Sequence, residues 1–288
     1  MSDPVKLSAR AVAARKGGDK LTMIAAYDYP VARLVEAAGI DLILVGDSLG
    51  MTVLGYDSPV PVTLDEVIYH CRAVVRGAPN THIVADMPFL TYHLDDAQAL
   101  ANAGRLLQEG GADAVKLEGG RGVISDRIRV LVSAGIPVMG HIGLTPQLGG
   151  TTGFGTQGED LDSALALLAD AEAVAVAGAY SMVVEAVPAE LARVITARVP
   201  IPTIGIGAGP DCDGQTVVST DLLGIESKLF LKFARRYAEL GEQIESAFRA
   251  YVSETRSGAF PGPDLSPHLD PNVLAALERQ LAADPKQP

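Results

Sequence analysis

The sequence predicts an α/β protein that folds as a (β/α)₈ barrel, the TIM barrel. Along its 288 residues, short runs rich in β-branched residues recur eight times, and most are followed by an Ala- and Leu-rich segment. Several runs are nearly continuous apolar stretches, which is typical of parallel strands buried on both faces. Parallel strands need crossover helices, and repetition of this unit along one chain favours a closed barrel over an open doubly wound sheet.

The eight predicted strands lie at residues 21–28, 41–48, 81–88, 112–119, 136–143, 180–187, 202–209 and 215–222. Three intervening segments are predicted helices that run into glycine: Ala32 to Ala38 before Gly39, Leu64 to Val75 before Gly77, and Ala97 to Glu109 before Gly110 and Gly111. Because glycine readily adopts the left-handed conformation that ends many helices, we interpret these glycines as C-caps.

The whole chain, residues 1–288, is expected to form one domain, with the barrel from about residue 20 to 252 and a tail from 253 to 288. Apolar residues spaced along Lys228 to Val252 predict an amphipathic helix. That helix could close the barrel or pack against a second subunit. We find no chemistry in the tail.

Composition excludes several kinds of partner. The formal charge of -12 and the absence of a Lys/Arg cluster argue against nucleic acid and anionic membranes. We find neither a signal peptide in the first 20 residues nor an apolar run long enough for a spanning helix. Cys71 and Cys212 show no Cys-x-x-Cys spacing, so a disulfide framework or zinc knuckle is not indicated. A cytoplasmic protein that binds small molecules is expected.

Two connections are long and rich in Gly and Pro. The first, 48–63, follows Asp47, and the second, 143–160, follows His141. In a barrel, segments that follow strands lie on the catalytic face, so we expect both to cover an active site. The alternative is that they are only long surface loops. The Gly-rich stretch 205–215 could bind phosphate through backbone N–H groups, or its glycines could serve close packing alone.

Ionisable residues gather where the predicted strands end. In a barrel these ends converge on one face, so residues far apart in sequence would share one pocket. The residues are Asp47, Asp86, Lys116, Glu118, His141 and Glu185.

Asp47, Asp86 and Glu118 would repel one another unless a cation neutralised them. Oxygen ligands without cysteine indicate a hard ion such as Mg²⁺. Such an ion could chelate a 2-oxo acid and stabilise the enolate formed when a neighbouring proton leaves. The sequence therefore predicts a metal-dependent enzyme that makes or breaks a carbon–carbon bond beside a 2-oxo acid.

Each of these residues also has a plain structural alternative. An aspartate followed by serine, as in Asp47-Ser48, is often a helix cap or turn former. Lys116 and Glu118 could be a solvated pair, although both point to the same side of an apolar strand. His141 could be a structural donor, and Glu185 a salt-bridge partner instead of a general base. The gathering of six such residues favours a functional site.

Long motifs of the chain closely resemble the 3-methyl-2-oxobutanoate hydroxymethyltransferase (ketopantoate hydroxymethyltransferase) family from about Leu21 to Pro263. They are TMIAAYDYP, VGDSLGMTVLGYDSPVPVTLDE, RGAP, ADMPF, GADAVKLEGG, GIPVMGHIGLTPQ, GIGAGPDCDGQ and SGAFPGP. The resemblance implies a barrel of the phosphoenolpyruvate/pyruvate type, a Mg²⁺ ion and a homo-oligomer, expected to be a decamer. It also implies transfer of a hydroxymethyl group from 5,10-methylenetetrahydrofolate to 3-methyl-2-oxobutanoate, giving 2-dehydropantoate for pantothenate synthesis.

The resemblance also implies roles for individual residues. Asp47 and Asp86 match aspartates of the metal and substrate site, and Glu118 matches the metal-site glutamate. Ser48 and Lys116 match residues that contact the oxo acid. His141 matches the pocket histidine, and Glu185 matches the proposed base.

The chain departs from the family's pattern in three places. Where the family commonly reads Tyr-x-Val-Gln-Gly-Lys/Arg, residues 154–159 read FGTQGE, so Glu159 replaces a basic residue. This change bears on substrate closure and folate affinity. In addition, Glu185-Ala186 stands for the usual Glu-Cys, and Thr220-Asp221 for the usual His-Asp. None of these changes removes a predicted metal ligand or the base.

Three alternatives to this function stay open on sequence grounds. One is a lyase or mutase of the same barrel type that acts on a different oxo acid. Another is a Schiff-base aldolase that uses Lys116. The third is a catalytically silent paralogue that binds an oxo acid. Fold alone decides between none of them.

Overall fold

The computed structural model describes residues 6–149, 155–225 and 234–283. The chain divides into two compact units, residues 1–238 and residues 239–288. The first contains the barrel and the whole of the candidate site.

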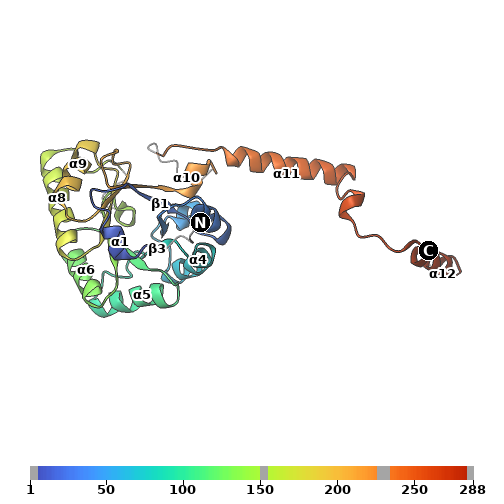
Figure 1. The fold of residues 1–288 in the computed structure, drawn as a ribbon, viewed down its shortest axis with the longest axis horizontal. Coiled ribbons are helices and arrows are strands. Elements are labelled where there is room, and N and C mark those ends of the chain that lie inside the picture. The colour runs from blue at the N-terminus through green and yellow to red at the C-terminus, as the bar shows by residue number, and fades with distance from the viewer. Residues whose placement is uncertain (1–5, 150–154, 226–233, 284–288) are drawn as a thin grey trace. The chain divides into compact units, whose positions relative to one another are not determined.

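All eight predicted strands are present and close into one parallel barrel in the order β1 to β8 (Figure 1). β8 pairs in parallel with β1, with Leu21 opposite Gly214, and this pairing closes the sheet. The strands are β1 (Leu21–Ala25), β2 (Leu42–Val45), β3 (His82–Asp86), β4 (Ala114–Glu118), β5 (Val138–Gly143), β6 (Ser181–Glu185), β7 (Thr203–Ile206) and β8 (Gly214–Val218). The predicted (β/α)₈ barrel is therefore confirmed.

The crossover helices lie around the outside of the strands (Figure 1). They are α2 (Tyr29–Ala37), α4 (Leu64–Gly77), α5 (Asp96–Gln108), α6 (Val123–Ser133), α8 (Leu161–Val176) and α9 (Ala189–Arg198). Shorter helices are α1 (Ala9–Ala13) before β1, α3 (Leu49–Thr52) in the first long connection, and α10 (Ser219–Leu223) after β8. The connection from β7 to β8, residues 207–213, contains no helix. The Gly-rich stretch there thus lacks the helix N-terminus that usually assists phosphate binding.

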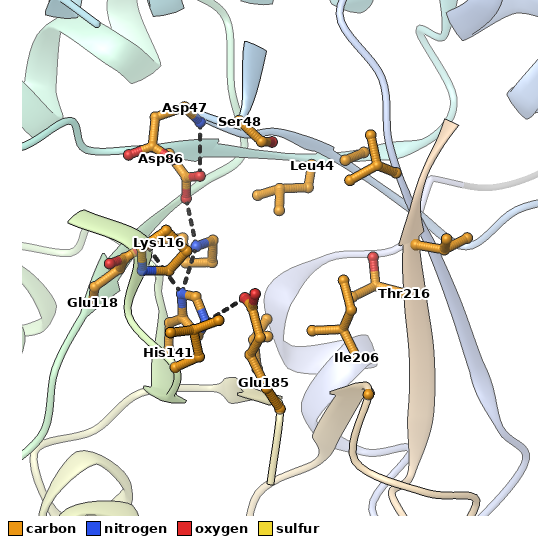
Figure 2. A pocket seen from close by; sticks show the side chains of 18 of the residues that line it. Leu44, Asp47, Ser48, Asp86, Lys116, Glu118, His141, Glu185, Ile206 and Thr216 are labelled. Atoms are coloured by element: carbon orange, nitrogen blue, oxygen red, sulfur yellow. Dashed lines mark hydrogen bonds and ion pairs between the residues drawn. The ribbon is translucent and has the colours of Figure 1, made fainter. Parts of the chain in front are cut away.

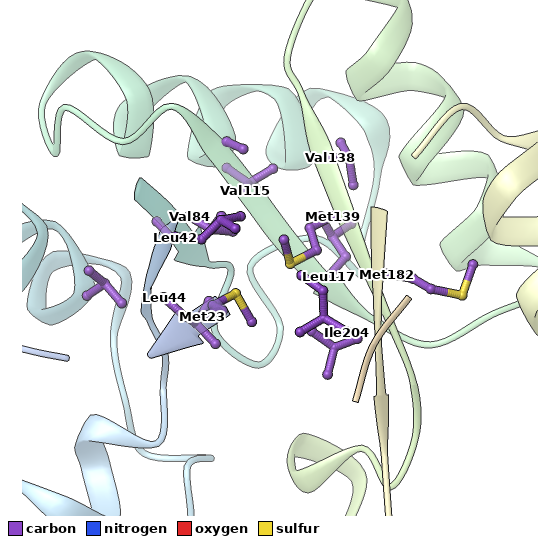
Figure 3. Close-up of a cluster of buried hydrophobic side chains, with 14 of the residues drawn as sticks. Met23, Leu42, Leu44, Val84, Val115, Leu117, Val138, Met139, Met182 and Ile204 are labelled. Carbon is purple, nitrogen blue, oxygen red and sulfur yellow. The ribbon is translucent and has the colours of Figure 1, made fainter. Parts of the chain in front are cut away.

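The strands are buried on both faces, as their apolar runs predicted. Every residue of β2, β3, β4 and β6 is buried. Figure 3 shows Val84, Val115, Leu117 and Met139 packed together from neighbouring strands. Because the strands are mostly apolar, the polar side chains of the site lie in their carboxyl-terminal halves or just beyond them, as Lys116 and Glu118 show on β4.

Of the four glycines interpreted as C-caps, Gly39 and Gly111 are confirmed, whereas Gly77 and Gly110 do not adopt a positive φ angle. Gly39 and Gly111 adopt positive φ angles of 79° and 78° directly after α2 and α5. Gly77 is instead the last residue of α4. A Cβ atom there would lie 2.6 Å from the carbonyl oxygen of Tyr29 and 2.9 Å from Cβ of Ala32. Glycine is needed at residue 77 because α2 and α4 pack closely, not because the helix must end.

A buried histidine network ties the N-terminal segment to the amino ends of the strands. His82 begins β3, and its Nδ1 lies 2.9 Å from the carbonyl oxygen of Leu7 while its Nε2 lies 3.0 Å from the Tyr180 hydroxyl. Since the carbonyl oxygen can only accept, Nδ1 carries the proton and the Tyr180 hydroxyl donates to Nε2. This network lies at the end of the barrel opposite the candidate site.

The predicted C-terminal helix begins later than expected. Ala234 to Glu239 are not helical, and α11 runs from Leu240 to Ser257; residues 228–233 lie outside the described part. The backbone N–H of Tyr237 donates to the carbonyl oxygen of Leu222, a bond that a helix through this point could not make. The second unit also contains η2 (Pro263–Leu265) and α12 (Pro271–Ala283). In the described chain, we find no helix with the length and apolar character to cross a membrane.

Candidate active site

The carboxyl ends of the strands surround a cavity of about 530 Å³. Every residue that the sequence predicted for the site lines it: Asp47, Ser48, Asp86, Lys116, Glu118, His141 and Glu185. Figure 2 shows their side chains gathered on one side of the cavity. Except for Ser48, all are buried. Convergence of these residues, predicted from the barrel geometry, is therefore confirmed.

Asp47 and Asp86 are tied together by a direct hydrogen bond. The backbone N–H of Asp47 donates to Oδ2 of Asp86 at 3.0 Å, and Oδ2 of Asp47 accepts a bond from the Gln147 side chain at 2.8 Å. A helix cap would accept from a backbone N–H of the helix that follows, as Asp28 does from Val31. Asp47 and Asp86 do not make such contacts, so the cap interpretation does not apply to them.

Lys116 is the ammonium group at the centre of the site. Its Nζ lies 2.9 Å from Oδ1 of Asp86 and 3.0 Å from Nδ1 of His141. The side chain is 4% exposed. Lys116 and Glu118 are thus not a solvated surface pair, and both take part in the buried cluster.

His141 lies between two carboxylates. Its Nε2 is 3.0 Å from Oε2 of Glu185, and its Nδ1 is 3.4 Å from Oε1 of Glu118. Since Glu118 and Glu185 end β4 and β6 and His141 lies on β5 between them, the histidine joins three neighbouring strands. Figure 2 shows the Glu185 carboxylate reaching from His141 into the cavity. This is the position required of a base that acts on a bound molecule.

Ser48 lies at the entrance to the first long connection. Its Oγ is 2.7 Å from the Tyr27 hydroxyl, so one of these two groups donates to the other. The Thr52 hydroxyl donates to the Ser48 carbonyl oxygen at 3.0 Å. The two bonds fix the serine at the edge of the cavity.

Burial and neighbouring charges set the protonation of the cluster. Burial raises the pKa of Asp47 well above its usual value, and the charges of Asp86 and Glu118 raise it further. Burial also raises the pKa of Asp86, although Lys116 opposes this shift. For Lys116, burial would lower the pKa, but the surrounding carboxylates outweigh it and raise the pKa. Lys116 is therefore a cation in this site.

Glu118 and His141 influence one another. Burial would raise the pKa of Glu118, but the hydrogen bond and charge of His141, together with Lys116, lower it. Burial and Lys116 oppose protonation of His141, yet Glu118 and Glu185 outweigh them and raise the pKa of His141 to about 9. The site as a whole attracts positive charge.

The charge balance of the site fits a cation. Five carboxylates, those of Asp47, Asp86, Glu118, Glu185 and Asp221, line the cavity together with Lys116 and His141. Burial is the main cause of the raised pKa of Asp47, and the neighbouring charges of Asp86 and Glu118 raise it further. Among the described residues, no three His, Cys, Asp or Glu side chains already form a ready-made metal site. The oxygen donors of Asp47, Asp86 and Glu118 nevertheless have the chemistry that Mg²⁺ prefers.

Part of the cavity wall is apolar. Leu44, Val183, Ile206 and Val218 contribute to it from β2, β6, β7 and β8. Figure 2 shows Ile206 and Thr216 across the cavity from Lys116 and His141, and Leu44 between Ser48 and the far side. A ligand with one charged end and one branched apolar end would match the charged and apolar parts of the wall.

Both long connections contribute to the cavity wall. Met51 and Thr52 of the first connection and Leu144, Pro146, Gly155 and Thr156 of the second line it. The backbone N–H of Gln157 donates to the Ala186 carbonyl oxygen at 2.8 Å, next to Glu185. Glu159 is exposed, and Phe154 lies outside the described residues. Thr156, which differs from the family's usual valine in the second connection, lines the cavity.

Three residues that support the site were not predicted from the sequence: Tyr27, Tyr92 and Gln147. Gln147 is 4% exposed and contacts Asp47, while the Tyr92 hydroxyl lies between Gln147 and the backbone of Glu118. Tyr27 and Gln147 belong to the motifs TMIAAYDYP and GHIGLTPQ. These motifs were the only signal for them, because neither residue carries a charge at a strand end.

The fold and the site together define a TIM barrel with a carboxylate-rich pocket at the carboxyl ends of its strands. Solved structures share this fold. A 2,3-dimethylmalate lyase of the PEP mutase/isocitrate lyase superfamily aligns with a TM-score of 0.57 at 17% identity, covering 96% of this chain and 100% of its own. A phosphonopyruvate hydrolase, solved with oxalate and Mg²⁺, aligns with a TM-score of 0.59 at 15% identity, covering 97% and 99%. At this level of identity they show that the barrel fold is shared.

The chain belongs to the ketopantoate hydroxymethyltransferase family, whose model matches residues 6–263. The 3-methyl-2-oxobutanoate hydroxymethyltransferase of Heliobacterium modesticaldum is 57% identical over 257 residues, covering 89% of this chain and 93% of its own. The enzymes of the same name from Dehalococcoides mccartyi and Chloroflexus aggregans are 52% and 55% identical, covering 94% and 91% of this chain and 96% and 93% of their own. The family resemblance stated from the motifs is confirmed.

Proposed function

We propose that this protein transfers a hydroxymethyl group from 5,10-methylenetetrahydrofolate to 3-methyl-2-oxobutanoate, giving 2-dehydropantoate in pantothenate synthesis. The observation that carries the proposal is the pairing of Glu185 with a buried carboxylate cluster in a cavity that also has apolar lining. The relatives that match nearly the whole chain bear the name of this activity. The oxo acid has a charged end for the cluster and a branched apolar end for Leu44 and Ile206.

Asp47, Asp86 and Glu118 would hold Mg²⁺, which when bound supplies Lewis-acid polarisation of the keto oxygen. Glu185 removes the proton from the carbon beside the keto group, and that carbon then bonds to the one-carbon unit of the folate. The bonds from this unit to the folate nitrogens break and water supplies the hydroxyl oxygen, so the products are 2-dehydropantoate and tetrahydrofolate. His141 holds the Glu185 carboxylate through Nε2. Lys116 balances negative charge on the oxo acid, and Ser48 donates a hydrogen bond to it from the cavity edge.

The charge on Lys116 bears on the Schiff-base alternative. A Schiff base needs a neutral amine, whereas Lys116 is ion-paired with Asp86 and its pKa is raised. The site therefore disfavours covalent catalysis by this lysine. The solved barrel structures share only the fold with this chain, at 14 to 18% identity, so they do not favour the lyase or mutase alternative. The proposed metal ligands and base are all present, which disfavours a silent paralogue.

The role of Glu185 can be tested without the folate. In deuterium oxide with Mg²⁺ and 3-methyl-2-oxobutanoate, the wild-type protein should exchange the proton at the carbon beside the keto group, followed by NMR. Glu185→Gln should slow this exchange roughly 10²-fold or more, because loss of a general base removes that much rate. Binding of Mn²⁺ should be unchanged.

The matched control is Glu190→Gln, since Glu190 is an exposed residue at the start of α9. It should exchange like the wild type. Undiminished exchange by the Glu185→Gln variant would show that another group removes the proton.

The homo-oligomer, expected to be a decamer, and the cytoplasmic location stay part of this proposal. Light scattering of the purified protein measures the mass of the assembly. A mass near 30.0 kDa, that of one chain, would contradict the oligomer.

A further inference from the structure

Gln147 is a buried polar residue to which the proposed mechanism gives no role. It lies in η1 (Pro146–Leu148), at the start of the second long connection. Its Nε2 donates to Oδ2 of Asp47 at 2.8 Å and to the carbonyl oxygen of Met87 at 2.9 Å. Its backbone N–H donates to Oε2 of Glu118 at 3.0 Å. One residue thus contacts carboxylates that follow β2 and end β4.

The orientation of the Gln147 amide is determined by its neighbours. The Tyr92 hydroxyl donates to Oε1 at 2.8 Å, and the Glu118 backbone N–H donates to that hydroxyl at 3.2 Å. If the amide were turned over, its oxygen would face two acceptors, Asp47 Oδ2 and the Met87 carbonyl, and the amide would lose both bonds. Tyr92 is fully buried, so the hydroxyl that orients the amide is itself fixed.

These bonds hold two carboxylates, those of Asp47 and Glu118, that are almost fully buried. Asp47 and Glu118 are 4% and 3% exposed, so water cannot orient them or offset their repulsion. Gln147 supplies a donor to one oxygen of each carboxylate. Each carboxylate keeps a second oxygen, which makes no bond to Gln147. Donors that hold ligand side chains in this way typically change metal affinity by roughly 10- to 100-fold.

We propose that Gln147 is a positioning residue, which, oriented by Tyr92, holds the carboxylates of Asp47 and Glu118 in place to receive the divalent cation. This inference rests on the proposed metal-assisted function. It assigns to the second long connection a part in building the metal site, in addition to forming the cavity wall.

The test measures cation binding directly, with Mn²⁺ as the probe and electron paramagnetic resonance as the readout, in the absence of substrate. Gln147→Met keeps the side-chain volume and removes the two donated bonds. Its dissociation constant for Mn²⁺ should rise roughly 10- to 100-fold. In an assay of 2-dehydropantoate formation, the Mg²⁺ concentration that gives half-maximal rate should rise by a similar factor. Saturating Mg²⁺ should restore most of kcat.

Two further variants separate positioning from folding. Tyr92→Phe removes only the hydroxyl that orients the amide and should weaken Mn²⁺ binding in the same direction by a smaller factor. Gln98→Met makes the same chemical change on α5, away from the cavity, and should bind Mn²⁺ like the wild type. If Gln147→Met fails to fold, Tyr92→Phe carries the test alone.

The outcomes distinguish the inference from the function on which it rests. Suppose that the wild-type protein binds Mn²⁺ and forms product. If Gln147→Met and Tyr92→Phe then bind Mn²⁺ as tightly as the wild type, the positioning role alone is overturned. A wild-type protein that binds no Mn²⁺ and shows no metal-dependent turnover overturns both. A loss of kcat in Gln147→Met that saturating Mg²⁺ does not restore, with Mn²⁺ affinity unchanged, also contradicts the inference.

Discussion

Lys116 shows how the surroundings of a single residue decide its chemistry. A lysine in an apolar strand is a candidate nucleophile when burial lowers its pKa. Here Asp86 lies 2.9 Å from its Nζ, and the nearby carboxylates outweigh burial. The amine therefore keeps its proton and acts through its charge.

We accordingly expect no covalent adduct on Lys116. Wild-type protein treated with 3-methyl-2-oxobutanoate and borohydride should keep its original mass by intact-protein mass spectrometry. Lys116→Gln should lower kcat/KM roughly 10²-fold or more, because a buried charged donor to the substrate is lost. A borohydride adduct mapped to Lys116 would replace the mechanism proposed above with a Schiff-base one.

At the scale of elements, the ends of β5 and β6 must approach closely to place Glu185. Gly143, the last residue of β5, has a φ angle of 92°. A Cβ atom there would lie 2.2 Å from the Glu185 carbonyl oxygen and 3.1 Å from its nitrogen. Glycine at residue 143 therefore allows the Glu185 backbone, and with it the base, to occupy its position.

Gly143→Ala should displace Glu185 and slow exchange of the substrate proton roughly 10²-fold, since small misplacements of a catalytic group have effects of that size. Gly135→Ala is the control, because Gly135 has a φ angle of 85° and no atom within 4 Å of an added Cβ. Both variants should lose about 1 to 3 kcal/mol of stability from backbone strain, measured by urea unfolding. Equal exchange rates in the two variants would contradict this assignment.

Elements also differ in how far their sequences reveal them. The strands were predictable because a strand buried on both faces must be apolar throughout, as β2 and β6 are. Gly77 was misinterpreted because a glycine needed for helix packing looks the same in sequence as a glycine that ends a helix. The start of α11 was placed too early because the apolar spacing continues through Tyr237, whose N–H instead bonds Leu222.

In the whole molecule, site residues could be predicted from the sequence when they lie at the carboxyl ends of strands, because the barrel brings these ends together. Asp47, Asp86, Glu118 and Glu185 follow or end strands and carry charge, so the fold alone brings them together. Gln147 was not predictable in this way. It lies 100 residues from Asp47 in the chain, and only the folded structure shows that its amide reaches that carboxylate.

The histidine network at the amino ends of the strands predicts how stability of the barrel depends on pH. Burial lowers the pKa of His82, although the charge of Asp113 opposes this shift. Below the usual histidine pKa of about 6.5, the unfolded chain takes up a proton that the folded chain resists. Because the unfolded state then binds more protons, the free energy of unfolding falls as the pH falls through that window.

Urea unfolding at pH 8 and pH 5.5 measures this dependence. His82→Asn keeps a donor toward Leu7 and removes the titrating ring, so it should be less stable than the wild type at pH 8. Its stability should decline less on acidification, and the gap between the two proteins should narrow. A constant gap across the two pH values would show that His82 does not contribute.

The most direct measurement of the central claim is formation of 2-dehydropantoate from 3-methyl-2-oxobutanoate and 5,10-methylenetetrahydrofolate, followed by mass spectrometry with added Mg²⁺ and with a chelator. We expect product with Mg²⁺, and its loss with the chelator and on substitution of Asp47 or Glu118 by Asn or Gln. Absence of product under both conditions, or equal turnover when the ion is removed, would contradict a metal-assisted hydroxymethyl transfer at these strand ends.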